Sequence, residues 1–314
     1  MDIIKVGNWN IIGNRKKFYA ISLIVIVSGI IAMIINMFTI GAPFNLGVDF
    51  TGGVVLEVQF DTLPEFQLIR EAFQKSGFTH IEIKTVDSPE NTVMLRVKAL
   101  SGEERQQVVE IIKNLPNFKA IVRQEFVGPS VARTLILNAF TATVIALILI
   151  LIYITIRFEF IYGLVTIAAL LHDVLVLLGV FAITRVAINS SFVAVVLILV
   201  GYSVMDTIVV MDRIRENKHI YVGMPFEELV NKSILSTFRR SFNTSVTTLL
   251  AALALLIVGG RLLLSYGLGL SVGITAGTYS SIFIASPLLV DIRRLQGRKK
   301  NVRQSQKRRN IKKR

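Results

Sequence analysis

The chain contains no cysteine, which excludes disulfide bonds, thiolate metal sites and cysteine nucleophiles. Histidine is scarce as well, and the three histidines, His80, His172 and His219, are too scattered to predict a metal cluster. No P-loop, G-x-S-x-G, H-E-x-x-H or G-x-G-x-x-G motif occurs in a suitable setting, so nothing indicates nucleotide hydrolysis or a hydrolase. We therefore expect no enzyme and no cofactor.

Acidic residues are almost missing from the C-terminal end, which makes the whole chain basic. Residues 291–314 contain twelve Lys or Arg and one acid, Asp291, whereas the formal net charge of the entire chain is +14. Because the basic charge is gathered in a tail and does not form a binding face, we expect no nucleic-acid binding. The simplest interpretation of 291–314 is a cytoplasmic tail that anchors the topology and contacts anionic lipid.

Long apolar runs, in contrast, are abundant. Hydrophobic residues make up 53% of the chain, and the mean hydropathy is +0.61. The run at 18–40 is longer than the apolar region of a signal peptide, so we expect a retained span. Five further runs predict a multi-pass α-helical membrane protein; they lie at about 135–156, 160–184, 190–211, 241–259 and 264–290.

The distribution of Lys and Arg predicts the orientation of these spans. Basic residues such as Arg157, Arg213 and Lys232 lie in the connections on the side of the N-terminus, and the opposite side has only two in its short loops. Cytoplasmic loops carry an excess of Lys and Arg. We therefore expect both termini, including residues 1–17, in the cytoplasm and residues 41–133 outside.

Residues 41–133 mix apolar and charged positions and predict a soluble domain. Strand patterns occupy 53–60, 79–86, 92–99 and 118–126, and helical patterns occupy 64–76 and the segment after Ser101. Ser101 and Glu104 have the spacing of a capping box. The order βαββαβ predicts a ferredoxin-like α+β domain outside the cytoplasm.

The remaining part, 134–290, is predicted to be a five-helix bundle with a cytoplasmic amphipathic segment at 212–240. The residues 212–217, together with His219, are most simply a solvated turn. An interfacial helix is expected to begin at Pro225, because the next apolar residues share one side of a helix. These residues are Phe226, Leu229, Val230, Ile234 and Phe238.

Ionisable residues inside spans are the strongest functional signals, since a charge at the bilayer centre costs about 2.5–3.5 kcal/mol on insertion scales. Asp206 lies near the cytoplasmic end of the fourth span, and Arg240 opens the fifth, with Thr244 on the same helix face. We expect Asp206 and Arg240 at similar depth, where they could load and release an ion. The alternative is that Arg240 only snorkels to the interface and Asp206 is a static partner.

Two further features leave alternatives open. Asp173, beside His172 in the third span, is either a relay carboxylate or a hydrogen-bonding group that packs helices together. Gly269, Gly273 and Gly277 form a small-residue stripe in the sixth span. Such a stripe lets another helix approach closely, and this helix belongs either to the same chain or to a partner.

Several segments together resemble the SecF family of protein-export subunits. Asp49, Gly52 and Gly53 lie in the first of them, and Gly128 and Pro129 in the second. The family usually has Asn where this chain has Met205. The resemblance extends over about residues 9–292 and rests on 47–53, 127–129, 172–173, 201–217, 240–248 and 277–287.

This resemblance implies a six-helix RND-like bundle in the bacterial plasma membrane that pairs with SecD beside the SecYEG channel, with YajC or YidC as further candidate partners. Such complexes use a proton or sodium gradient to help draw unfolded proteins outward. Asp206 and Arg240 correspond to the family's intramembrane pair, while SecD supplies a third carboxylate. The alternatives are half of an RND-type exporter for small molecules or lipids, and a scaffold for the translocase that transports nothing.

Overall fold

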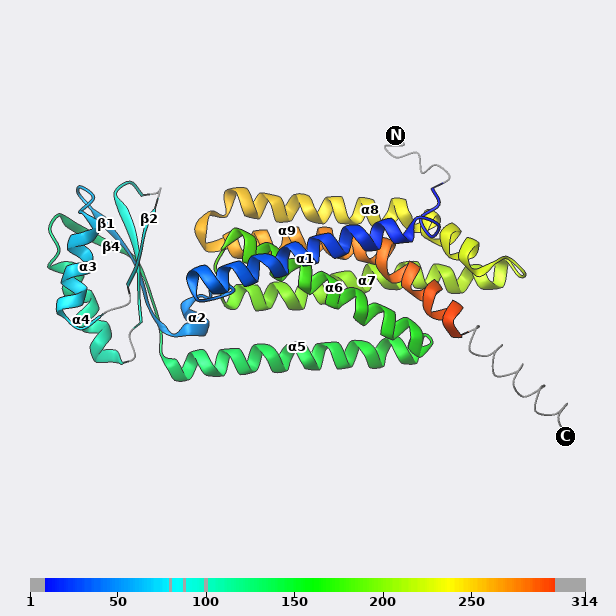
Figure 1. Ribbon diagram of the computed structural model, residues 1–314, viewed down its shortest axis with the longest axis horizontal. Helices are drawn as coiled ribbons and strands as arrows, with labels where there is room; N and C mark the ends of the chain where they lie inside the picture. Colours follow the sequence, from blue (N-terminus) through cyan, green and yellow to red (C-terminus); the bar gives the residue numbers. More distant parts are fainter. Residues whose placement is uncertain (1–8, 79–80, 87–88, 99–100, 297–314) are drawn as a thin grey trace. The chain divides into compact units, whose positions relative to one another are not determined.

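The computed structural model describes residues 9–78, 81–86, 89–98 and 101–296 (Figure 1). His80 and the part of the basic tail beyond Gln296 lie outside these ranges, as do residues 1–8. Residues 46–142 and 187–190 form one compact unit, which we call the α+β unit; the rest of the described chain forms the helical unit. The α+β unit overlaps the predicted outer domain.

The α+β unit contains one antiparallel sheet with the strand order β2-β3-β1-β4. This order and the βαββαβ succession confirm the ferredoxin-like fold. A short helix, α2 (Val48–Thr51), precedes the sheet. The elements are β1 (Gly53–Phe60), α3 (Phe66–Lys75), β2 (Ile81–Val86), β3 (Thr92–Val97), α4 (Gly102–Lys113) and β4 (Phe118–Val127).

Alternation along the strands places the core of this unit on one face of the sheet. Val54, Leu56 and Val58 of β1 are fully buried together with Phe73 of α3 and Ile112 of α4. Figure 1 shows α3 and α4 on the same side of the sheet. Successive strand residues point to opposite faces, so every second residue of a strand faces the two helices, and these residues are apolar.

The predicted capping box at the start of α4 is confirmed. The backbone N–H of Glu104 donates to the Ser101 hydroxyl at 3.1 Å, and the backbone N–H of Ser101 donates to the Glu104 carboxylate at 2.9 Å. Two N–H groups that lack a partner within the helix are satisfied in this way.

Six helices are long and apolar enough to cross a bilayer, which confirms a multi-pass helical protein. Figure 1 shows α1 and α6 side by side in the helical unit. The six are α1 (Arg15–Ile40), α5 (Pro129–Arg157), α6 (Phe160–Thr184), α7 (Ser190–Ile220), α8 (Phe226–Val258) and α9 (Gly260–Ser280), which continues through a π-helical segment, η1 (Ser281–Ala285), toward Gln296.

The connection between the fourth and fifth spans differs from the prediction. Residues 212–217 are helical and not a turn, because α7 continues to Ile220. The expected interfacial helix is the beginning of the unbroken α8, and its residues Leu229, Val230 and Ile234 are buried in the core of the helical unit. The Asn217 side chain donates to the Ser233 hydroxyl at 2.8 Å in this buried contact.

The lengths of these two helices explain the difference. At 1.5 Å per residue, α7 and α8 are about 45–50 Å long, well beyond the roughly 30 Å hydrocarbon core of a bilayer. Their extra turns pack against protein, so the apolar side of 226–238 is covered by the chain itself and not by lipid.

Candidate functional site

The glycine stripe of α9 packs against α7 of the same chain. A Cβ atom built on Gly269 would lie 2.8 Å from Val195, one on Gly273 would lie 3.0 Å from Leu199, and one on Gly277 would lie 3.0 Å from the Cβ of Ser203. Both sets of contacts advance by four residues in the same direction, so α7 and α9 run parallel in close contact. The helix that packs on the stripe therefore belongs to the same chain.

The same register brings the next turn of α9 to the intramembrane carboxylates. That turn is the π-helical segment η1, which begins at Ser281. The hydroxyl of Ser286 donates to the backbone carbonyl of Ser281 at 3.0 Å, five residues back. Ser280 and Ser281 are both fully buried at this point. π turns within α-helices occur frequently at functional sites.

Asp173 is fully buried and accepts hydrogen bonds at both carboxylate oxygens. The hydroxyls of Ser203 and Ser280 donate to Oδ2 at 2.6 and 2.9 Å, and His172 Nδ1 lies 2.9 Å from Oδ1. His172 Nε2 lies 2.9 Å from the hydroxyl of Ser22. The resulting network, which we call the Asp173 network, joins side chains of α1, α6, α7 and α9.

A neutral His172 with its proton on Nδ1 satisfies this network. Nδ1–H then donates to Asp173, and Nε2 accepts from the hydroxyl of Ser22. Ser22 and His172 also line an apolar groove of about 520 Å³ formed by α1, α6, α8 and α9. The Asp173 network therefore ends at the wall of this groove.

Asp206 has very different surroundings, although it is only 8% exposed. Ser241 of α8, Ser281 of η1 and Arg240 lie near this carboxylate, and the Ser281 hydroxyl donates to the carbonyl of Thr278 at 3.0 Å. Within the described part of the chain, Asp206 Oδ2 and the hydroxyl of Ser241 lie buried without a hydrogen-bond partner. Arg240 therefore lies in the neighbourhood of Asp206, and no ion pair within 4.0 Å joins these two described residues.

Arg240 and the polar residues that follow it face outward from the chain. Arg240, Asn243, Thr244 and Thr247 are exposed along one side of α8. Thr244 donates to the carbonyl of Arg240, and Thr247 to that of Asn243, so these hydroxyls bond within their own helix. We call this side of α8 the polar stripe. Met205, at the position of the family's usual Asn, is also exposed, by 60%.

The predicted motif residues Asp49, Gly52 and Gly53 have structural roles in the α+β unit. Asp49 accepts from the backbone N–H and the hydroxyl of Ser190, at 2.7 and 2.6 Å, and so caps the first turn of α7. Gly52 and Gly53 have φ angles of +69° and +122°, and a Cβ atom on Gly53 would lie 2.6 Å from the carbonyl of Val97. Both positions require glycine.

Gly128 and Pro129 mark the entry into α5. Pro129 is the first residue of that helix, a position where its missing N–H costs nothing. Gly128 has no atom near the place of a Cβ and no positive φ. Nothing in the structure explains a need for glycine there.

The sequence places Ser203 near Asp206 on one helix and Ser281 after the glycine stripe, but it does not predict the set of serines around the two carboxylates. Ser22, Ser203, Ser241, Ser280 and Ser281 come from four different helices. Ser22 contacts His172, and the other four lie near Asp173 or Asp206. Serine is common in membrane helices, and its spacing along one helix does not reveal a partner on another. Ser203, Ser241, Ser280 and Ser281 do lie in the segments that carry the family resemblance, which is the signal that could have found them.

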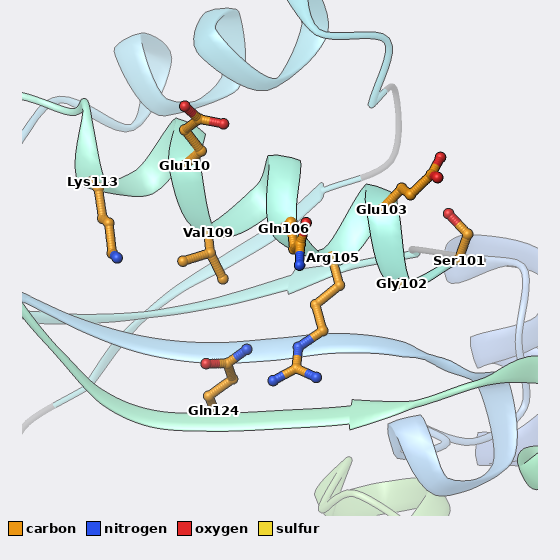
Figure 2. A pocket seen from close by; sticks show the side chains of 9 residues that line it. All are labelled: Ser101, Gly102, Glu103, Arg105, Gln106, Val109, Glu110, Lys113 and Gln124. Carbon is orange, nitrogen blue, oxygen red and sulfur yellow. The ribbon is translucent and has the colours of Figure 1, made fainter.

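The α+β unit carries a surface groove. It lies between α4 and β4, and Figure 2 shows Arg105, Val109 and Lys113 extending from α4 toward the strand that carries Gln124. Its volume is about 1140 Å³, and charged or polar side chains dominate its lining. Pockets for small ligands are mostly apolar with few polar groups, so this groove does not resemble one.

Comparison with protein families identifies two matching regions. Residues 107–295 match "Protein export membrane protein SecD/SecF, C-terminal", and residues 38–62 match the "SecD/SecF GG Motif". The second region contains Gly52 and Gly53, and the first contains Asp173, Asp206 and Arg240.

Similar proteins carry the same family name. The chain is 40% identical over 288 residues to a protein translocase subunit SecF of Sebaldella termitidis, covering 90% of this chain and 93% of the relative. It is 36% identical over 301 residues to the subunit of that name from Rhodothermus marinus, covering 93% of this chain and 96% of the relative.

Two solved structures are similar in fold. The first is SecDF, a translocon-associated membrane protein, from Thermus thermophilus, with a TM-score of 0.78 and 34% identity; the alignment covers 91% of this chain and 39% of the other. The second is SecDF in its super-membrane-facing form, with a TM-score of 0.66, 30% identity, and coverage of 96% and 41%. The chain thus spans about two fifths of these longer proteins.

Proposed function

Since this chain belongs to the SecD/SecF family of protein export membrane proteins, and resembles the SecF translocase subunit over most of its length, we propose that it couples an ion gradient to protein export. In this function it pairs with SecD beside the SecYEG channel and helps draw unfolded polypeptides outward. A proton or a sodium ion is the coupling ion.

The observation that carries the proposal is the state of Asp206. Burial of a carboxylate oxygen without a hydrogen-bond partner is energetically unfavourable, which indicates a functional role for Asp206. Arg240 lies close to this carboxylate. The interaction of a carboxylate with a nearby positive charge depends on the distance between them. Small helix movements that change the distance between Asp206 and Arg240 would let Asp206 bind and release an ion.

The outward direction of the polar stripe supports a partner helix bundle. Arg240 and the three polar residues that follow it would otherwise face hydrocarbon, which is unfavourable. A SecD bundle with a carboxylate at this depth would pair with Arg240 and complete the site. Asp173 belongs to the same site in this proposal, as a fixed neighbour of the exchanging group.

The proposed location is the bacterial plasma membrane, with both termini in the cytoplasm. Several basic residues lie at the helix ends that are expected on the side of the N-terminus; among the described residues these are Arg15, Arg157, Lys218 and Arg293. This agrees with the excess of positive charge in cytoplasmic loops. The α+β unit then lies outside, where an exported chain emerges.

The proposal is tested by secretion in a strain depleted of the native subunit. Asp206→Asn and Arg240→Ala should each abolish the stimulation of export at unchanged membrane levels, because each removes one charge of the pair. Asp212→Asn, an exposed acid on the same helix, should behave like the unmodified protein. Normal secretion by both site variants would instead favour a scaffold role.

A further inference from the structure

Four basic side chains gather at one end of the helical unit, where α5, α7 and the extension of α9 beyond η1 all end. Figure 1 shows these helix ends at the same end of the unit as the start of α1. Two of the four bases lie in the last turns of α7, and the other two helices supply one each. We call them the basic cluster; its members are Arg157, Arg215, Lys218 and Arg293.

An aromatic ring holds the first pair of the cluster. The guanidinium carbons of Arg157 and Arg215 lie 5.6 and 5.9 Å from the centre of the Phe158 ring. A cation within about 6 Å of a ring centroid is attracted to the ring face. Arg215 also donates to the backbone carbonyl of Arg157 at 3.3 Å. The end of α5 and the last turns of α7 therefore bring two positive charges together.

Neighbouring rings tie the second pair to the first. The rings of Phe158 and Tyr162 lie 5.8 Å apart. Lys218 Nζ and the guanidinium carbon of Arg293 lie 5.7 and 5.6 Å from the centre of the Tyr162 ring. Both cations also contact Phe226 of α8, at 5.8 and 4.9 Å from its ring centre. One group of aromatic rings therefore carries all four bases.

The basic cluster has more positive charge than its ion pairs neutralise. Among the described residues, Glu159 is the one acid that pairs with the four bases, 3.5 Å from Lys218 and 2.8 Å from Arg293. The next acids along the helices, Glu216 and Glu227, pair with other bases. Arg293 Nε is buried without a hydrogen-bond partner in the described part of the chain. An anion between these bases would relieve the repulsion of like charges and supply an acceptor.

An exposed apolar ridge on α5 leads to the cluster. Ile145, Leu149 and Tyr153 precede Arg157 at intervals of four residues, so they form one row along the helix surface. These three side chains are 51%, 60% and 56% exposed. From Ile145 to Arg157 the row is about 18 Å long at 1.5 Å per residue. This is slightly more than half of the roughly 30 Å hydrocarbon core, the depth of one leaflet.

We propose that the basic cluster binds the phosphate of an anionic phospholipid whose acyl chain lies along the α5 ridge. Basic pockets between membrane helices are known to bind anionic lipid head groups. The ridge favours a lipid over a free phosphate, because it places an apolar surface one leaflet deep next to the positive charge. The bound phosphate would contact side chains of α5, α7 and the α9 extension, so the lipid would hold these helix ends together. This site goes beyond ion coupling and differs from the tail after Gln296.

The test is a calorimetric titration of the full chain, in neutral detergent at about 0.15 M salt, with short-chain phosphatidylglycerol. Lys218→Gln/Arg293→Gln should weaken binding about tenfold, as expected for the loss of a hydrogen bond to a charged group. The matched control, Arg213→Gln/Lys232→Gln, removes the same charge from α7 and α8 outside the cluster and should change the affinity by less than about twofold. The tail beyond Gln296 is present in every variant, so its contribution cancels.

A second pair of variants guards against a folding defect. Lys218→Arg/Arg293→Lys keeps both charges and should bind nearly as tightly as the unmodified chain. If Lys218→Gln/Arg293→Gln does not accumulate in the membrane, Arg157→Gln/Arg215→Gln takes its place, since both of those bases are exposed. It should weaken binding by the same factor.

Three further probes identify the ligand. Phosphatidylcholine of the same chain length should bind more weakly than phosphatidylglycerol, because its choline cation neutralises the phosphate. Inorganic phosphate should also bind more weakly, because it has no acyl chain to cover the ridge. Equally tight binding of inorganic phosphate would make this a free-phosphate site, and binding of a glutamate-rich peptide without phosphatidylglycerol would make it a protein interface. Either result, or equal losses in the cluster variant and its matched control, would overturn the lipid site.

Discussion

Asp173 and Asp206 are both acids inside helices long enough to cross a bilayer, but their neighbours give them different properties. Asp173 is surrounded by hydroxyl groups and an imidazole that together occupy its oxygens. Asp206 has serine and arginine neighbours and keeps an open oxygen. The sequence placed both in spans, and the difference between them comes from residues on other helices.

Removal of the Asp173 carboxylate should be strongly destabilising. In Asp173→Ala, the buried groups of His172, Ser203 and Ser280 lose their acceptor, and breaking such a network costs about 3–5 kcal/mol. Unfolding of the purified protein in mixed detergent should show this loss. The exposed Asp212→Ala is the matched control, and equal stability of the two variants would contradict the network's role.

A second residue-scale expectation concerns Asp49. Its two bonds to Ser190 satisfy the start of α7, so Asp49→Ala should cost about 1 kcal/mol locally. Hydrogen exchange at the first turn of α7 should become faster, while exchange in α4, which has its own capping box, should stay the same. Unchanged protection in α7 would show that the cap has no energetic importance.

Helices α7 and α9 illustrate how one element sets the geometry of another. Small residues at every fourth position of α9 allow a parallel, close contact with Val195, Leu199 and Ser203. A similar close contact occurs where α1 meets α6, since a Cβ on Gly29 would lie 2.5 Å from the Cα of Gly179. The second crossing was not predicted, because two isolated glycines in separate helices form no sequence pattern.

The α7–α9 contact predicts opposite effects for two glycine substitutions. Gly277→Ala places a methyl group 3.0 Å from the Cβ of Ser203, and overpacking of this kind costs about 1–3 kcal/mol. Gly201→Ala, on the α7 face with no atom within 4 Å, should gain about 0.5–1 kcal/mol from helix propensity. Thermal unfolding in detergent compares them, and equal shifts would contradict the proposed close contact.

On the scale of the whole molecule, ion pairs join segments that are distant in the sequence. They lie at the end of the helical unit where Arg15 is found. Arg15 lies 2.9 Å from Asp291, and Arg293 lies 2.8 Å from Glu159. The Asn231 side chain accepts from the backbone N–H of Ile11 and donates to the carbonyl of Trp9. Asp291 and Arg293 belong to the predicted tail at 291–314, but these contacts lie within residues 9–296 and do not depend on the part of the tail beyond Gln296.

Truncation after Gln296 should therefore leave export at the level of the full chain. The tail is interpreted as a topology anchor that contacts anionic lipid, so the truncated protein should bind less tightly to anionic vesicles. The difference in binding between the truncated and the full chain should be larger at low salt, where charges are screened less. Secretion and membrane level are measured in the depleted strain. A lost export phenotype at normal membrane level would contradict the anchor interpretation.

The sequence by itself determined the six spans, the βαββαβ order, the capping box at Ser101 and the candidates Asp206, Arg240 and Asp173. These features depend on local hydropathy, on periodicity and on the cost of a charge in lipid, all of which are visible in a single chain segment. The tertiary structure alone decided the length of the α7–α8 hairpin, the outward direction of the polar stripe, and the set of serines around the two carboxylates. Those features depend on the rotation and register of one helix against another, which close contacts such as Gly277 with Ser203 determine and which no single segment contains.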